Sequence, residues 1–327
     1  MSRLESYDRA VIVTNDKAAK FKNLNIYELK NVINNEVVAP LKRFGINKCD
    51  ILNQPTILDL DSIKKDKRGY PIVICGGDGT MAPIVDYAAR EMLPNILLPR
   101  PYGGANDIAT SLYGNMRLDD ILASASPEVA YTIEAIIENE NKQRIARALG
   151  YFGIGASAEA ARAINEHKDT DKTNLATKLR AARAVLNSKP FTYLDSNGNT
   201  QKSLEISIIN YRMAGLFKSE EDTTFSPEAT MYKAERQSQI ISIACLGLLG
   251  IAKGAKIEEN QSLSIRKLSK TVFQYDGEHL DIEPGTDITI KSGPPVNVMR
   301  LDTNRSMRTA NDKYRIDNIF YKRNIKV

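Results

Sequence analysis

The first residues that could carry chemistry form the run Gly76-Gly77-Asp78-Gly79-Thr80, which follows the apolar stretch Val73–Cys75. Glycines let an anionic ligand approach the main chain, and the amides at a following helix start can cradle phosphate oxygens. Asp78 in such a cradle calls for a cation, and a magnesium ion beside bound phosphates would supply it. Thr80 adds a hydroxyl. On this run alone, a turn without any ligand fits equally well.

A second glycine turn, Gly103-Gly104-Ala105-Asn106-Asp107, follows the next apolar stretch. Turns at the carboxyl ends of neighbouring parallel strands meet at one edge of a sheet, where α/β proteins bind their ligands. Asn106 can both donate and accept hydrogen bonds. Asp78 and Asp107 together would hold magnesium through water molecules, as that ion prefers. The two turns therefore predict one shared phosphate site.

A third run, Asp276-Gly277-Glu278, lies far along the chain. Phosphorylation of a hydroxyl needs a carboxylate that orients the acceptor oxygen and takes its proton. Asp-Gly is also a common hairpin-turn dipeptide, so a purely structural turn is the alternative. The sequence does not decide between Asp276 and Glu278 as the base, although we favour Glu278.

The elements that must position these runs fall into two regions. Up to about residue 125, strand and helix patterns alternate, which predicts a parallel, doubly wound α/β layer. Its expected strands are 10–15, 56–60, 70–75 and 95–101, and its expected helices cover 25–45, 81–90 and 106–114. From about Tyr131, short strands separated by turn residues predict a mostly antiparallel β-sandwich.

One helix, residues 173–187, is expected to interrupt the sandwich. Leu175, Leu179, Ala182 and Leu186 share one of its faces, and basic residues lie elsewhere. We expect the apolar face to pack on the protein's own sheet, with a membrane surface as the alternative partner. The apolar run Ile240–Ala252 is too short to span a bilayer as a helix, so no transmembrane segment is expected. It fits the sandwich core and the wall of an acyl-chain pocket equally well.

Composition narrows the classes of function. The 327 residues carry a net charge of +5, which is too diffuse for a nucleic-acid binder. Three separated cysteines and two histidines argue against disulfides, structural zinc and histidine-based catalysis. The start of the chain does not resemble a signal peptide, so a cytoplasmic location is expected. Residues 300–327 hold eight basic residues against three aspartates, which favours a solvated tail, with an anionic membrane surface as the alternative.

In this order and spacing, GGDGT, GGAND and DGE resemble the motifs of the diacylglycerol kinase catalytic family, which includes bacterial lipid kinases, sphingosine kinases and ceramide kinases. The resemblance covers nearly the whole chain. Asn15 and Lys20 in VIVTNDKAAK match its first strand and turn, and GYFGIGASAEAAR matches the start of its second domain. It implies an ATP-binding α/β domain related to NAD kinases and phosphofructokinases (residues 1–127, with 301–327 returning to it), and a β-sandwich acceptor domain (128–300).

The resemblance also implies roles for individual residues. The family draws its catalytic base from the DGE run, here Asp276 and Glu278, and Asp78 is expected to be essential for turnover. Magnesium would be held by Asp78 and Asp107. The expected ATP-binding residues are Asn15, Gly76, Gly77, Asp78, Gly79, Thr80, Gly103, Gly104, Asn106 and Asp107.

The chain departs from the family pattern at several positions. Gly104 stands where the family has Thr or Ser, and Ala82 and Pro83 stand where it has Asn-Glu. Ser157 replaces an aspartate, and the acidic run expected after Pro227 is missing. These losses cluster around the metal and the acceptor, so they bear more on the identity of the acceptor than on ATP.

The leading hypothesis is an ATP-dependent lipid kinase of lipid metabolism that phosphorylates a hydroxyl of a diacylglycerol-like acceptor, with peripheral membrane contact. One alternative is a related kinase acting on a soluble acceptor such as NAD, and another is a non-catalytic nucleotide or lipid sensor. The sequence leaves the lipid and the oligomeric state open, with a homodimer as one option.

Overall fold

The computed structural model describes ten stretches of the chain: residues 7–54, 57–65, 69–103, 106–140, 142–166, 174–210, 229–236, 238–240, 255–257 and 262–301. Gly104, Pro227, residues 241–252 of the apolar run and the tail 302–327 lie outside them. Over the described stretches, no helix is both long enough and apolar enough to cross a membrane.

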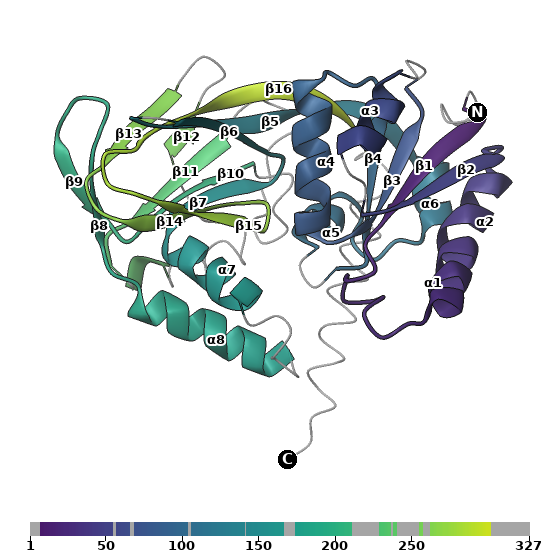
Figure 1. Ribbon diagram of the computed structural model, residues 1–327, viewed down its shortest axis with the longest axis horizontal. Helices are drawn as coiled ribbons and strands as arrows, with labels where there is room; N and C mark the ends of the chain where they lie inside the picture. The colour runs from purple at the N-terminus through teal and green to yellow at the C-terminus, as the bar shows by residue number, and fades with distance from the viewer. Residues whose placement is uncertain are drawn as a thin grey trace.

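The N-terminal part is built on four parallel strands in the order β2-β1-β3-β4. These are β1 (Arg9–Thr14), β2 (Lys48–Asn53), β3 (Pro71–Gly76) and β4 (Ile96–Pro101). Helices α1 (Ile26–Ile33) and α2 (Ala39–Arg43) lie on one face, and α3 (Ile57–Lys65) and α4 (Asp78–Arg90) on the other (Figure 1). All six residues of β3 are buried, as expected for a strand covered on both faces. The predicted doubly wound layer is therefore present.

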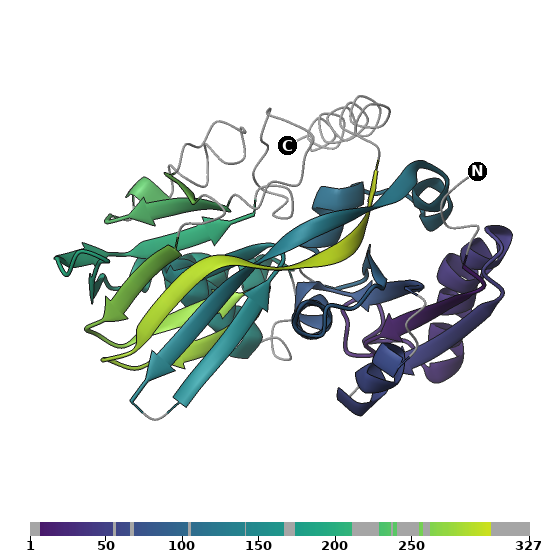
Figure 2. The ribbon, with the colours of Figure 1, turned by 90° about the horizontal axis from the view of Figure 1, so that it is seen from above.

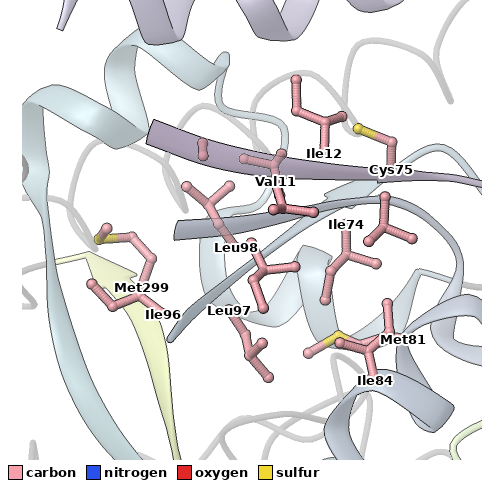
Figure 3. Close-up of a cluster of buried hydrophobic side chains, with 14 of the residues drawn as sticks. Val11, Ile12, Ile74, Cys75, Met81, Ile84, Ile96, Leu97, Leu98 and Met299 are labelled. Atoms are coloured by element: carbon pink, nitrogen blue, oxygen red, sulfur yellow. The ribbon is translucent and has the colours of Figure 1, made fainter. Parts of the chain in front are cut away.

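A hydrophobic core fills the space between this sheet and its helices. Figure 3 shows Ile74 of β3 and Leu97 of β4 in the same cluster as Met81 and Ile84 of α4. Met299, near the end of the chain's last described strand, belongs to the same cluster. The helix that follows the first glycine turn is therefore fixed by its apolar face, which leaves its N-terminus in place at the edge of the sheet.

The C-terminal part is a sandwich of antiparallel strands. One layer is a six-stranded sheet in the order β12-β11-β10-β7-β14-β15. It comprises β7 (Tyr151–Gly155), β10 (Glu205–Ile209), β11 (Ala229–Ala234), β12 (Ala255–Ile257), β14 (Thr271–Tyr275) and β15 (Glu278–Ile282). The facing strands are β5 (Ala125–Asn139), β6 (Lys142–Ala148), β8 (Phe191–Leu194), β9 (Thr200–Ser203), β13 (Ser262–Lys267) and β16 (Asp287–Leu301). Apolar residues of both layers form a second core, so the predicted sandwich is present.

Two long strands connect the parts. β5 and β16 pair antiparallel along most of their lengths, and β16 also pairs parallel with β4 at Asn297 and Val298. Figure 2 shows this twisted pair running from the sandwich into the α/β part. The parallel strands and one layer of the sandwich thus belong to a single ten-stranded sheet. Helices α5 (Asp107–Tyr113) and α6 (Leu118–Ser124) precede β5.

Some local predictions were wrong. Residues 57–60, expected as a strand, belong to helix α3, and the strand that enters the sheet is β2, residues 48–53. β2 is an edge strand, and two of its six residues are half-buried while the others are exposed. Because so little of it is buried, its sequence contains no long apolar run. A π-helical turn, Asn34–Val38, lies between α1 and α2, just before Pro40 in the first turn of α2. The helix α7 (Ala156–Glu166) was not expected.

The predicted amphipathic helix is present as α8 (Asn174–Asn187), but its orientation differs from the prediction. α8 packs against α7, which lies between it and the six-stranded sheet (Figure 1). Leu179 and Leu186 are 61% and 55% exposed. The expectation that this apolar face packs on the protein's own sheet is therefore wrong for Leu179, Ala182 and Leu186, and the half-buried positions include Ala181 and Ala184 instead. The side chain of Leu175, the fourth residue of the predicted face, lies outside the described residues.

Candidate active site

The GGDGT run forms the connection from β3 to α4. A side chain at Gly76 would place its Cβ 2.5 Å from the Cβ and Oγ1 atoms of Thr80, so only glycine fits there. Asn15, at the end of β1, donates a hydrogen bond from Nδ2 to Thr80 Oγ1 at 3.0 Å. The carboxyl ends of the neighbouring strands β1 and β3 are thereby joined at Thr80, the first turn of α4.

The GGAND run forms the connection from β4 to α5. Its described residues are closed by Asn106, whose Oδ1 accepts from the Gly103 amide at 2.9 Å and whose Nδ2 donates to the Gly103 carbonyl at 2.8 Å. The Tyr102 amide donates to the Gly76 carbonyl at 3.1 Å. The two glycine turns therefore lie side by side at the carboxyl edge of the sheet, as the sequence predicted.

Asp78 connects these two turns. Its carboxylate accepts hydrogen bonds from the backbone amides of Asp107 (2.9 Å) and Ile108 (3.3 Å), at the start of α5. The side chain is buried. Burial, together with the negative charge of Asp107, raises the pKa of Asp78 to about 7, against the opposing effect of the two amides. Asp78 is thus a buried link between the helices as well as a candidate ligand.

Asp107 lies beside it and is only half-buried. Burial raises the pKa of Asp107. Two neighbouring carboxylates that each resist ionisation form a place that a cation would stabilise. Among the described residues, no group of three or more His, Cys, Asp or Glu side chains forms a metal site. The pair fits a hydrated magnesium ion, which needs few protein ligands.

Asp276 is held inside the protein. It occupies the first position of the β14–β15 turn, where its φ is +40° and that of Gly277 is +88°. Its buried carboxylate accepts hydrogen bonds from the amides of Leu149 (2.6 Å), Gly150 (3.0 Å) and Tyr151 (2.9 Å). Burial raises the pKa of Asp276 to about 6, although these amides act to lower it. The carboxylate anchors the turn to the connection between β6 and β7.

Glu278 has the opposite environment, because its side chain is exposed. Its Oε1 lies 3.4 Å from the position that a Cβ on Gly79 would take. A Cβ on Gly277 would lie 3.3 Å from the Gly79 amide nitrogen. The DGE turn therefore lies directly against the GGDGT turn, although about 200 residues separate them in the sequence. Glycine at 79 leaves the space beside the Glu278 carboxylate open.

Sequence reasoning missed the ion pairs that hold this arrangement. Arg147 on β6 contacts Asp86 on α4 at 3.1 Å and Glu134 on β5 at 2.8 Å. It is buried, and it lies two residues before Leu149, which holds Asp276. Arg147 thus fixes the helix that carries Asp78 against the strand that leads to the Asp276 anchor. Nothing in the local pattern RIARALG distinguishes this arginine from a surface one.

A second missed residue is Glu205 on β10. Its carboxylate accepts hydrogen bonds from the Ser157 amide (2.8 Å) and the Ser157 hydroxyl (2.5 Å), and from the hydroxyl of Ser207. Burial raises the pKa of Glu205. A carboxylate is therefore present beside Ser157, the position where the family pattern has an aspartate. The alternation of β10 places Glu205 on the outer face of its sheet, which suggests an exposed residue, but there it contacts Ser157 of the unexpected helix α7.

Lys20 does not reach the glycine turns. Its Nζ pairs with Glu36 at 2.6 Å and lies 4.4 Å from the centre of the Tyr102 ring. The Tyr102 hydroxyl also donates to Glu36, at 2.8 Å. Lys20 thus fastens the loop after β1 to the π-helical turn and to the residue that precedes Gly103.

Comparison with known proteins gives a fold but no family assignment. No protein-family model matches the chain, and no curated protein matches it. Among solved structures, it is similar to a protein of Bacillus anthracis str. Sterne proposed to be a diacylglycerol kinase, with a TM-score of 0.59 and 16% identity over 91% of this chain and 99% of that one. A diacylglycerol kinase structure from the same organism gives a TM-score of 0.55 and 15% identity, over 91% and 98% of the two chains. The chain therefore shares the fold of these diacylglycerol kinase structures, as the order of its three motifs led us to expect.

Proposed function

We propose that this protein is a lipid kinase, which transfers the γ-phosphoryl group of ATP to a hydroxyl group of a diacylglycerol-like acceptor. The observation that carries the proposal is the contact between the DGE turn and the GGDGT turn, with the exposed Glu278 carboxylate beside Gly79. A carboxylate next to a phosphate cradle is what phosphorylation of an alcohol requires. The fold likeness supports the same conclusion.

The nucleotide phosphates would lie against the amides of residues 76–80, at the start of α4, where the helix dipole favours negative charge. Asn15 and Thr80 hold this turn at the end of β1, and Asn106 closes the turn beside it. Asp107 would hold a magnesium ion directly or through water, and Asp78 would support it by accepting the hydrogen bond of the Asp107 amide. When bound, magnesium would neutralise charge on the phosphates and orient them for transfer.

Glu278 is our choice for the general base. It would accept the proton of the acceptor hydroxyl while that oxygen bonds to the γ-phosphorus and the bond to the leaving ADP oxygen breaks. Asp276 is unsuited to this role because three backbone amides already occupy its buried carboxylate. We assign Asp276 to positioning: it fixes the turn from which Glu278 projects.

The two variants Glu278→Gln and Asp276→Asn test this division of roles. With labelled ATP and a total lipid extract, Glu278→Gln is expected to lower kcat at least about 100-fold with unchanged ATP affinity and an unchanged urea midpoint. Asp276→Asn is expected to lower the urea midpoint, because an amide cannot accept all of the hydrogen bonds that the carboxylate receives. Full turnover by Glu278→Gln would refute its role as base.

The same assay separates the alternatives. The product is identified by its mass, and NAD is offered beside the lipid extract as a soluble acceptor. Phosphorylated NAD without any phosphorylated lipid would assign the protein to the soluble-acceptor class. ATP binding with no phosphorylated product from either source would indicate a non-catalytic sensor.

A further inference from the structure

Helix α8 presents its largest described apolar side chains to solvent. The exposed positions Leu179, Ala182, Arg183 and Leu186 are spaced as one stripe along the helix, while residues such as Ala181, Ala184 and Val185 are half-buried. A surface helix of a globular protein usually has the reverse arrangement, with leucines inwards. Leucines on the outward face of a helix indicate a surface that contacts something else.

The charge on and beside this stripe is entirely positive. Between Asn174 and Pro190 there is no Asp or Glu, whereas there are four Lys or Arg residues. Arg183 lies within the stripe, and Lys189 is exposed just beyond its end. Within the stretches that the structure describes, neither forms an ion pair. An exposed apolar stripe with basic side chains and no acidic ones is complementary to an anionic lipid surface.

The position of α8 relates this face to the candidate active site. α8 is the outermost layer on its side of the molecule, with α7 between it and the six-stranded sheet (Figure 1). At the end of α7, Asn165 donates a hydrogen bond from Nδ2 to the Gly277 carbonyl at 3.0 Å. A single helix therefore separates the exposed leucines from the turn that carries Glu278.

We propose that the outward face of α8, residues 179, 182, 183 and 186, docks on the surface of an anionic lipid bilayer. The helix would lie in the plane of the interface, with Leu179 and Leu186 among the acyl chains and Arg183 and Lys189 at the headgroups. This inference rests on the proposed lipid acceptor, since docking at this face would bring the bilayer to the side of the protein on which the DGE turn lies.

The test is flotation of the full chain, without ATP, with vesicles of phosphatidylcholine alone or mixed with phosphatidylglycerol. The double variant Leu179→Ser/Leu186→Ser is expected to lower the partition coefficient for mixed vesicles at least about tenfold, because each leucine loses apolar burial. Arg183→Ser/Lys189→Ser is expected to remove the preference for mixed vesicles. The matched control is Ile26→Ser/Tyr27→Ser on α1, where the residues are 58% and 76% exposed, and it should bind like the wild type.

Failure to bind mixed vesicles, or equal loss in the control, would overturn the proposal. A second outcome would also overturn it: the wild type is a dimer that does not bind vesicles, and Leu179→Ser/Leu186→Ser converts it to a monomer. A second copy of the chain, not a bilayer, would then cover α8. Phosphorylation of acceptor dispersed in detergent micelles tests the proposed function separately. If micellar acceptor is not phosphorylated while vesicle binding depends on α8, docking stands and the lipid-kinase assignment fails.

Discussion

Lys267 carries a buried amine, and its charge should lower the stability of the fold. It lies at the end of β13, fully buried, with its Nζ 3.7 Å from the centre of the Phe191 ring. Its ammonium group has no hydrogen-bond partner in the described part of the chain. Burial lowers the pKa of Lys267 from 10.5 to about 7. We predict that Lys267→Met stabilises the protein, because it removes a charge that folding must take out of water.

The magnitude follows from the pKa. At about 1.4 kcal/mol per unit, a fall from 10.5 to about 7 corresponds to at most about 5 kcal/mol when the amine is charged. The Phe191 ring face attracts the cation and offsets about 2 kcal/mol of this cost. A gain of about 2–3 kcal/mol at pH 6 is therefore expected from the methionine.

The pH dependence has a definite sign. The folded pKa lies below the unfolded one, so the full cost is present below pH 7, where both states are protonated. Between about pH 7 and 10.5, the folded protein has released the proton that the unfolded chain still holds, and the stability of the wild type rises with pH. The advantage of Lys267→Met should therefore shrink as the pH rises from 6 to 9.

Urea denaturation at pH 6 and pH 9 measures both effects. The control is Lys202→Met, which removes the same charge at an exposed position on β9 and should leave the midpoint within about 0.5 kcal/mol of wild type. No gain at pH 6 would refute the assignment of a costly buried amine. An equal gain at both values of pH would show that packing, not charge, is responsible.

Three further predictions concern the site. Gly76→Ala should weaken ATP binding at least about tenfold by calorimetry, because its methyl group would collide with Thr80; unchanged affinity would contradict the tight turn. Arg147→Met should cost up to about 3 kcal/mol in urea denaturation, because the buried Glu134 carboxylate keeps only the exposed Lys291 as a described ion-pair partner, and Arg147→Met/Glu134→Leu should recover most of it; no recovery would argue against that ion pair. Asn106→Ala should raise the KM for ATP several-fold with little change in kcat, since it opens the turn that Asn106 closes; a fall in kcat alone would contradict a positioning role.

The sequence predicted the elements that are buried on both faces. The runs that became β1, β3 and β4 are apolar because helices cover both sides of the sheet. Where burial is partial, the prediction failed: the edge strand β2 has no apolar run, and α3 was taken for a strand. Periodicity showed that residues 174–187 form a helix but not which face points outwards, because that depends on how α7 packs.

The site was predicted unevenly for a related reason. Glycines and acidic residues that follow strands mark the carboxyl edge of a sheet, so the approach of the first two turns could be expected. The contact of Gly277 with Gly79 depends on packing between distant segments, which no local pattern encodes. The sequence also shows Asp276 and Glu278 simply as two carboxylates in one turn. The structure distinguishes them, because three backbone amides hold the Asp276 carboxylate inside the protein while that of Glu278 is exposed.

The paired strands β5 and β16 have a consequence for how this chain could be divided. In many two-part enzymes, a flexible linker lets each part fold or move by itself, whereas here one continuous hydrogen-bonded ribbon belongs to both. A fragment that stops before residue 287 would lack the partner that β4 has at Asn297 and Val298. The edge of β4 would then present unpaired backbone groups, which favour aggregation. The last strand that the structure describes thus completes the sheet that the first strands begin, and during synthesis this edge of β4 stays unpaired until β16 has emerged.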